Sequence, residues 1–191
     1  MIKTTVRASQ THLLLDTLKF YFSLLQTITK MASLQRTLVN LEMLSDDISA
    51  LSKDAINTAA HTKLLHSVLE ELKNADSLVT LETEASFQKA LSGSLFENIF
   101  KRKRMVGVYI KLVGYVITAW EATNKANAII SENFDSSADK RLELLQVKAI
   151  KAKSQLKTVA SAMGKEDYAK FVQTLGLSAQ EWQWDTLRAR F

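Results

Sequence analysis

The chain contains no proline in 191 residues, and this absence constrains its fold more than any other feature of the sequence. Proline ends helices because it lacks a backbone N–H and its ring clashes with the preceding turn. Glycine, which also weakens helices, occurs only five times. No stretch alternates between apolar and polar residues for long enough to predict a strand. We therefore expect an all-α fold with unusually long helices.

Apolar residues at helical spacing predict one very long first helix. Their steps of three and four are typical of a stripe along one helix face; its members are Leu14, Leu18, Tyr21, Leu25, Ile28, Met31, Leu34, Leu38, Leu41, Leu44, Ile48, Leu51 and Ala55. Two successive steps of three between Ile28 and Leu34 break the heptad repeat. Ser45 followed by two aspartates resembles a helix start, so residues 11–60 form one helix or two. Because the stripe continues in phase, we favour one helix of about 40 residues or more, roughly 60 Å long, and a rod-shaped molecule.

Shorter helical patterns follow, separated by turn signals. Helices are expected over about 64–79, 105–130, 138–163 and 168–175, and the turn signals are Ser92-Gly93-Ser94, residues 131–137, Gly164 and Gly176. Residues 178–181 match a capping box that would open a last helix. We expect an elongated all-α bundle of three to five helices, one or two of them very long and amphipathic. Residues 1–191 form a single domain, which could end in a short docking helix over 178–191.

The residues needed for common catalytic sites are missing. The chain has no cysteine, no Gly-x-Ser-x-Gly elbow, no phosphate-binding loop and no pair of Glu-x-x-His motifs. His66 and Glu70 share a helix face and could supply half a metal site, but a surface pair of this kind is more common. We predict a non-enzymatic protein with no catalytic residue, metal or cofactor.

One segment combines a cationic cluster with a long apolar run. Four consecutive cations precede sixteen residues whose only charge is Lys111. The candidate residues are Lys101, Arg102, Lys103, Arg104, Val108, Tyr109, Ile110, Lys111, Val113, Tyr115, Val116 and Trp120. A helix that is apolar nearly all round must be buried in protein or in lipid. Sixteen residues span about 24 Å, less than the roughly 30 Å of a hydrocarbon core. We favour the central helix of a bundle or an oligomer interface, and keep entry into an anionic membrane as the alternative.

Charge is unevenly divided along the chain. Residues 1–100 carry nine Lys/Arg against eleven Asp/Glu, and residues 101–191 carry sixteen against nine. The basic half could bind an anionic partner, or the two halves could complement each other within a bundle or an oligomer. Lys140, Lys148 and Lys151 fall near one helix face and could follow phosphates, although a solvated face is the simpler interpretation.

The C-terminal residues predict a docking segment. Trp184, Leu187 and Phe191 share one helix face, while Trp182 points elsewhere. No secretory signal is evident, so a soluble form is expected, in an unknown compartment. We predict an interaction or assembly protein that binds protein partners or itself through helix faces. The alternatives are a membrane-active protein, pore-forming-like or peripheral, that uses residues 101–120, and nucleic-acid binding through the basic half.

Overall fold

The computed structural model describes residues 3–51, 58–80, 83–84, 88, 93–131 and 136–177. These residues form six α-helices and no strand, so the all-α prediction is confirmed. The helices are α1 (Lys3–Ser49), α2 (Ala59–Leu78), α4 (Leu95–Phe100), α5 (Lys103–Ser131), α6 (Ser136–Met163) and α7 (Lys165–Thr174). The described part of the chain has six helices, rather than three to five, because two short ones, α4 and α7, accompany four long ones.

Helix α1 is one unbroken helix of 47 residues, which confirms the prediction of a single long first helix. At 1.5 Å per residue it is about 70 Å long. Ser45 does not start a new helix: its hydroxyl donates to the backbone carbonyl of Thr174, 3.5 Å away, and so links α1 to the end of α7. The helix ends at Ser49, before the predicted end of the apolar stripe at Ala55, which lies outside the described residues.

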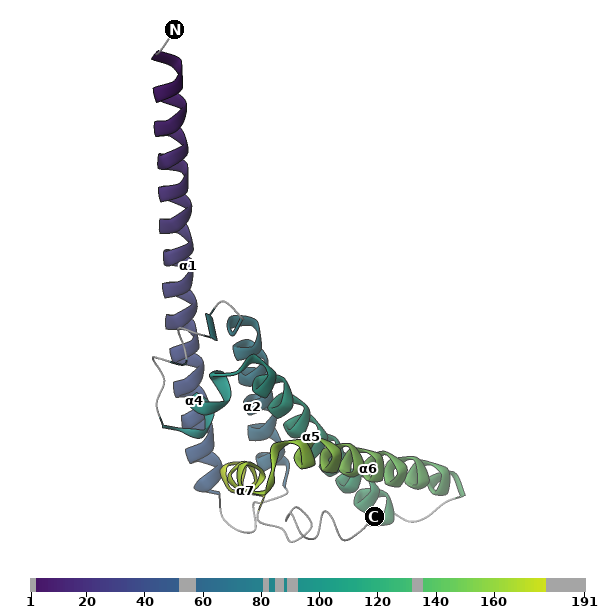
Figure 1. The fold of residues 1–191 in the computed structure, drawn as a ribbon. Coiled ribbons are helices and arrows are strands. Elements are labelled where there is room, and N and C mark those ends of the chain that lie inside the picture. Colours follow the sequence, from purple (N-terminus) through teal and green to yellow (C-terminus); the bar gives the residue numbers. More distant parts are fainter. Residues whose placement is uncertain are drawn as a thin grey trace.

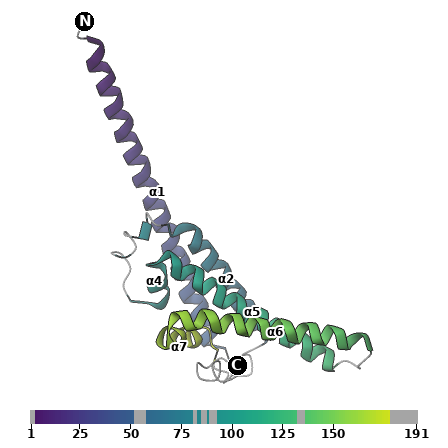
Figure 2. The same cartoon turned by 45° about the vertical axis from the view of Figure 1, so that its right-hand side comes forward.

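The protein is elongated in two directions. In Figures 1 and 2, the N-terminal part of α1 extends far from the other helices. Helices α5 and α6 form a hairpin that extends away from the C-terminal part of α1 (residues 31–49), which we call its foot. The rod expected for the whole molecule is therefore restricted to α1. The C-terminal part of α1 packs against α2, α2 packs against α5, and α5 packs along α6. Helices α4 and α7 fill the space where these elements meet.

One apolar core joins α1, α2, α5, α6 and α7. Its side chains come from every long helix, and the largest fully buried ones are Tyr168, Phe100, Phe171, Leu34, Leu38, Leu41, Leu65, Leu72, Leu112 and Leu156. The rings of Tyr109 and Phe171 meet edge to face, with centroids 5.6 Å apart, as aromatic pairs prefer. The core thus lies at the foot of α1.

Turn chemistry fixes the short helices around this core. Ser94 caps α4: its hydroxyl accepts from the Glu97 backbone N–H, and the Glu97 carboxylate accepts from the Ser94 N–H. The predicted turn here is confirmed at Gly93 and Ser94, while Ser92 lies outside the described residues. After α7, Gly176 has a φ of 61°, which side chains other than glycine tolerate poorly. A Cβ atom there would lie 2.9 Å from Cγ2 of Ile48, so glycine also permits the close approach of this turn to α1.

Candidate interaction surfaces

The N-terminal part of α1 presents apolar side chains to solvent. Every described side chain from Leu15 to Gln26 is exposed, and we call residues 15–30 the arm. Its large exposed side chains are Leu15, Leu18, Phe20, Tyr21, Phe22, Leu24, Leu25 and Ile28, with exposed fractions between 45 and 67%. Single exposed apolar residues are normal, but a contiguous apolar surface of this size is rare on soluble monomers.

The apolar stripe of α1 lies on two opposite faces of the helix. Leu25 and Leu34 differ by nine positions, which is about 2.5 turns, so they point in opposite directions. Leu34 is 1% exposed and faces the core, whereas Leu25 is 61% exposed and faces away from it. The expectation of a single continuous face from Leu14 to Ile48 is therefore wrong. The two successive steps of three after Ile28 rotate the stripe from the outer face to the inner one.

The outward face continues beside the core. Tyr21 and Val39 differ by eighteen positions, about five complete turns, and so lie on one line along the helix; both are exposed. Leu25 and Met43 stand in the same relation, and Met43 is exposed as well. The outer face of α1 is therefore apolar on the arm. Beside the core it still carries exposed Val39 and Met43, but among exposed charged residues such as Arg36 and Asp46.

The remaining side of the arm is a narrow polar strip. It carries Lys19, Ser23 and Lys30, together with Asp16, whose carboxylate lies 3.9 Å from the Lys19 ammonium. The hydroxyl of Thr29 donates to the Leu25 carbonyl, at 2.9 Å, within the same helix. Because the Thr29 hydroxyl is bonded within the helix, the Thr29 methyl group is the part of the side chain that faces outward. The sequence contained the signal for this surface, because apolar residues between positions 15 and 28 surround more than half of the helix.

The apolar segment predicted at residues 105–120 forms the N-terminal half of α5, at the centre of the fold. The predicted residues Tyr109, Val113, Val116 and Trp120 are buried, Val108, Ile110 and Tyr115 are partly buried against the core, and Lys111 is exposed. In the part of the chain that the structure describes, α5 is the one helix long and apolar enough to cross a membrane by length and composition. Half of its apolar window is buried within the protein.

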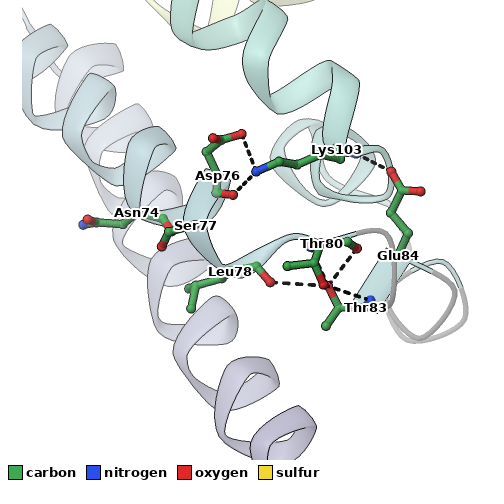
Figure 3. A network of polar contacts seen from close by, with 8 residues as sticks. All are labelled: Asn74, Asp76, Ser77, Leu78, Thr80, Thr83, Glu84 and Lys103. Carbon is green, nitrogen blue, oxygen red and sulfur yellow. Dashed lines mark hydrogen bonds and ion pairs between the residues drawn. The ribbon is translucent and has the colours of Figure 1, made fainter.

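The cationic cluster before this segment is partly occupied with internal contacts. The Lys103 ammonium pairs with the Asp76 carboxylate, at 2.8 Å, and also donates to the Asp76 backbone carbonyl (Figure 3). The Lys103 backbone N–H donates to the Glu84 carboxylate at 2.5 Å, and Lys101 donates to the Asn98 side chain at 3.1 Å. Arg102 and Arg104 are exposed. The cluster therefore joins the end of α2 to the start of α5, rather than presenting four solvated cations.

Buried polar groups in the core act as structural links. His61 is fully buried, its Nε2 atom lies 2.9 Å from the Leu175 carbonyl, and its ring contacts Trp120 with centroids 4.8 Å apart. Because a carbonyl only accepts, Nε2 carries the proton. Burial lowers the pKa of His61, although the Leu175 hydrogen bond opposes this effect. Burial raises the pKa of both Tyr109 and Tyr168 above the ordinary value for tyrosine, so both hydroxyl groups stay protonated.

The half metal site considered for His66 and Glu70 is not assembled. His66 Nε2 lies 2.9 Å from the carboxylate of Glu121 on α5, and Glu70 pairs with Lys73 at 2.7 Å. Among the described residues, no group of three or more His, Cys, Asp or Glu side chains could hold a metal ion. His61 and His66 thus each have a contact that links elements of the fold.

The basic face predicted on α6 is exposed and is partly apolar. Lys140, Lys148 and Lys151 all lie in solvent, and Leu144 and Val147, which lie between them on the helix, are 69% and 55% exposed. The structure thus brings these lysines to one surface, far along the α5–α6 hairpin. The predicted docking tail, with Trp182, Trp184, Leu187 and Phe191, lies outside the described residues.

Comparisons with known proteins do not identify a family for this chain. No protein-family model, no curated protein and no solved structure matches this chain.

Proposed function

We propose that this chain is a non-enzymatic interaction and assembly protein that binds protein partners, or further copies of itself, through exposed faces of its helices. The observation that carries this proposal is the arm of α1, where every described side chain from Leu15 to Gln26 is exposed. Soluble monomers rarely keep so much contiguous apolar surface in water. The hydrophobic effect therefore favours any protein surface that covers the arm.

Photo-crosslinking from two positions of the arm tests this proposal. A benzoylphenylalanine at Leu25 probes the apolar face, and the same group at Ser23 probes the polar strip, about 160° away on the helix. Both positions are exposed, so neither change disturbs the core. In cells that express the chain, we expect protein adducts from position 25 and few from position 23. No protein adduct from position 25, or equal yields from both, would contradict the proposal.

A membrane-active role is the second candidate, and the apolar length of α5 favours it. Entry of α5 into lipid would require it to leave α2 and α7, since Tyr109 and Trp120 are buried against them. Incubation with anionic liposomes tests this role: dye release and a blue shift of tryptophan fluorescence are its expected signs. Binding of random duplex DNA that weakens steeply with salt would instead support the third candidate, a nucleic-acid interface at Lys140, Lys148 and Lys151.

A further inference from the structure

The outward face of α1 carries a heptad repeat that is apolar at six of its seven a and d positions, with Gln35 as the exception. Steps of three and four alternate strictly along it, which is the spacing of the a and d positions of a coiled coil. We call this set the outer seam; its members are Leu18, Tyr21, Leu25, Ile28, Ala32, Gln35 and Val39. All seven side chains are exposed. The repeat is continuous on this face even though the core-facing stripe of the same helix is displaced from it.

We propose that the outer seam pairs with the outer seams of other copies of this chain, in a coiled coil of at least three helices. This inference rests on the proposed function and deepens it by naming the partner. The body of the protein packs on the opposite face of α1, at Leu34 and Leu41, and covers one flank of the seam only at Leu38, beside the core. On the arm both flanks of the outer seam are open. The bodies would lie around the outside of the bundle.

The width of the apolar surface sets the minimum number of chains. A two-stranded coil covers the a and d positions and leaves their flanks in water. Here the flanking e and g positions are also apolar at Leu15, Phe22, Leu24 and Met31. Covering both flanks of each helix requires a neighbour on each side, which three or more chains provide. Leucine at a, with isoleucine at d, as in Leu25 and Ile28, likewise favours more than two strands.

The absence of charge on this surface favours copies of the same chain as the partner. From Thr17 to Gln35, no a, d, e or g position carries a charged residue. On the arm, self-pairing therefore brings no like charges together, and the e and g charges that normally select a different partner are missing. Beyond the arm, the exposed Arg36 occupies one e position beside Val39. Asp16, Lys19 and Lys30 lie on the polar strip, which would face outward. A lipid surface requires no heptad repeat, and the outer seam continues to Val39, beside the core.

The available area is sufficient for a stable complex. The eight large apolar side chains of the arm are 45 to 67% exposed. All of them except Phe20 lie at a, d, e or g positions. With about 200 Å² for one large side chain in full exposure, these seven present on the order of 800 Å² per chain. A stable protein interface buries about 800 Å² on each partner. The arm alone reaches that value, before the seam residues at the foot of α1 are counted.

Sedimentation of the purified full chain tests the inference. Over about 1 to 100 μM, we expect wild-type protein to reach the mass of three or more chains. Leu25→Glu places a charge in the seam and should raise the dissociation midpoint at least tenfold. The matched control Ser23→Glu adds the same charge to the polar strip and should leave the midpoint unchanged. Far-UV circular dichroism and urea unfolding should show an intact core in both variants, because both positions are exposed.

Several outcomes would overturn the inference: a monomer or a dimer throughout this range, or equal association of Leu25→Glu and wild type. Binding of a monomer to vesicles of phosphatidylserine and phosphatidylcholine that Leu25→Glu abolishes would identify lipid, and not a second copy, as the occupant. A monomer that still gives protein adducts from position 25 in cells would refute self-assembly alone. A monomer without such adducts would refute the proposed function as well.

Discussion

Buried His61 should make the protein less stable as the pH falls below neutrality. The ring is fully buried between α2, α5 and the turn after α7, where it contacts Trp120 and donates to the Leu175 carbonyl. Burial lowers its pKa below the ordinary value of 6.5. The folded state therefore takes up the proton less readily than the unfolded chain does. The stability contributed by neutral His61 is fully present above pH 6.5 and is lost as the pH falls below that value.

The size of this effect has an upper limit. A group that is neutral in the folded state and has a pKa of 6.5 when unfolded costs about 1.4 kcal/mol between pH 7.5 and pH 5.5. The Leu175 hydrogen bond opposes the shift, since the protonated ring can still donate it. We therefore expect a loss in the free energy of unfolding that stays below this limit.

Urea unfolding at pH 7.5, 6.5 and 5.5, at one protein concentration, measures this loss. The matched variant is His61→Gln, whose amide can donate to the same carbonyl but does not titrate. The variant should be less stable than wild type at pH 7.5, because it lacks the ring contact with Trp120, and its stability should change less with pH. The reasoning fails if the two proteins lose the same free energy between pH 7.5 and 5.5, or if wild type gains stability.

Three further predictions concern contacts among the other helices and the turn after α7. Gly176→Ala should destabilise the fold by about 1 to 3 kcal/mol in urea unfolding, because of its positive φ and the 2.9 Å approach to Ile48; a neutral effect would contradict the backbone geometry. The Lys103–Asp76 pair, whose side chains are 36% and 41% exposed, should show a coupling of only about 0.5 kcal/mol in a double-mutant cycle with Lys103→Met and Asp76→Asn. Leu156→Ala should cost about 2 to 5 kcal/mol, since this side chain is fully buried, and a midpoint like that of wild type would place α6 outside the core.

Most helices could be predicted from the sequence because their signals are local. The absence of proline and the spacing of apolar residues indicated one long first helix, and Gly164 and Gly176 marked helix ends. Similarly, the all-round apolarity of residues 105–120 indicated a helix that must be covered, and the core buries half of these residues and partly buries most of the others. These predictions needed no knowledge of which segments meet in space.

Partners that are distant in the sequence could not be predicted. Lys103 belonged to an apparent cluster of solvated cations, yet it pairs with Asp76, 27 positions earlier. His66 was considered beside Glu70 on its own helix, but it bonds to Glu121 on α5. In both cases, the pattern within one segment gave the chemistry of the side chain correctly and gave no information about its neighbour.

The apolar stripe of α1 was misassigned for a different physical reason. Steps of three and four are compatible with any one face over a few turns, but two successive steps of three rotate a stripe backwards by about 60° each. Between Ile28 and Leu34 this rotation transfers the stripe from the solvent side to the core side. Adding about 100° per residue around the helix axis, instead of counting only the local spacing, would have shown that the stripe lies on two faces.

The proposed assembly would stabilise the arm of α1 as a helix. The inner face, from Leu34 onward, anchors the helix to the core, and this anchor supplies the costly nucleus of helix formation. The arm beyond it contains several threonines and aromatic residues, which have modest helix propensity, and none of its described side chains between Leu15 and Gln26 is buried. Its helical state therefore gains little from the body of one chain. Covering the outer seam would supply the missing stabilisation, so association and arm helicity should rise together with concentration.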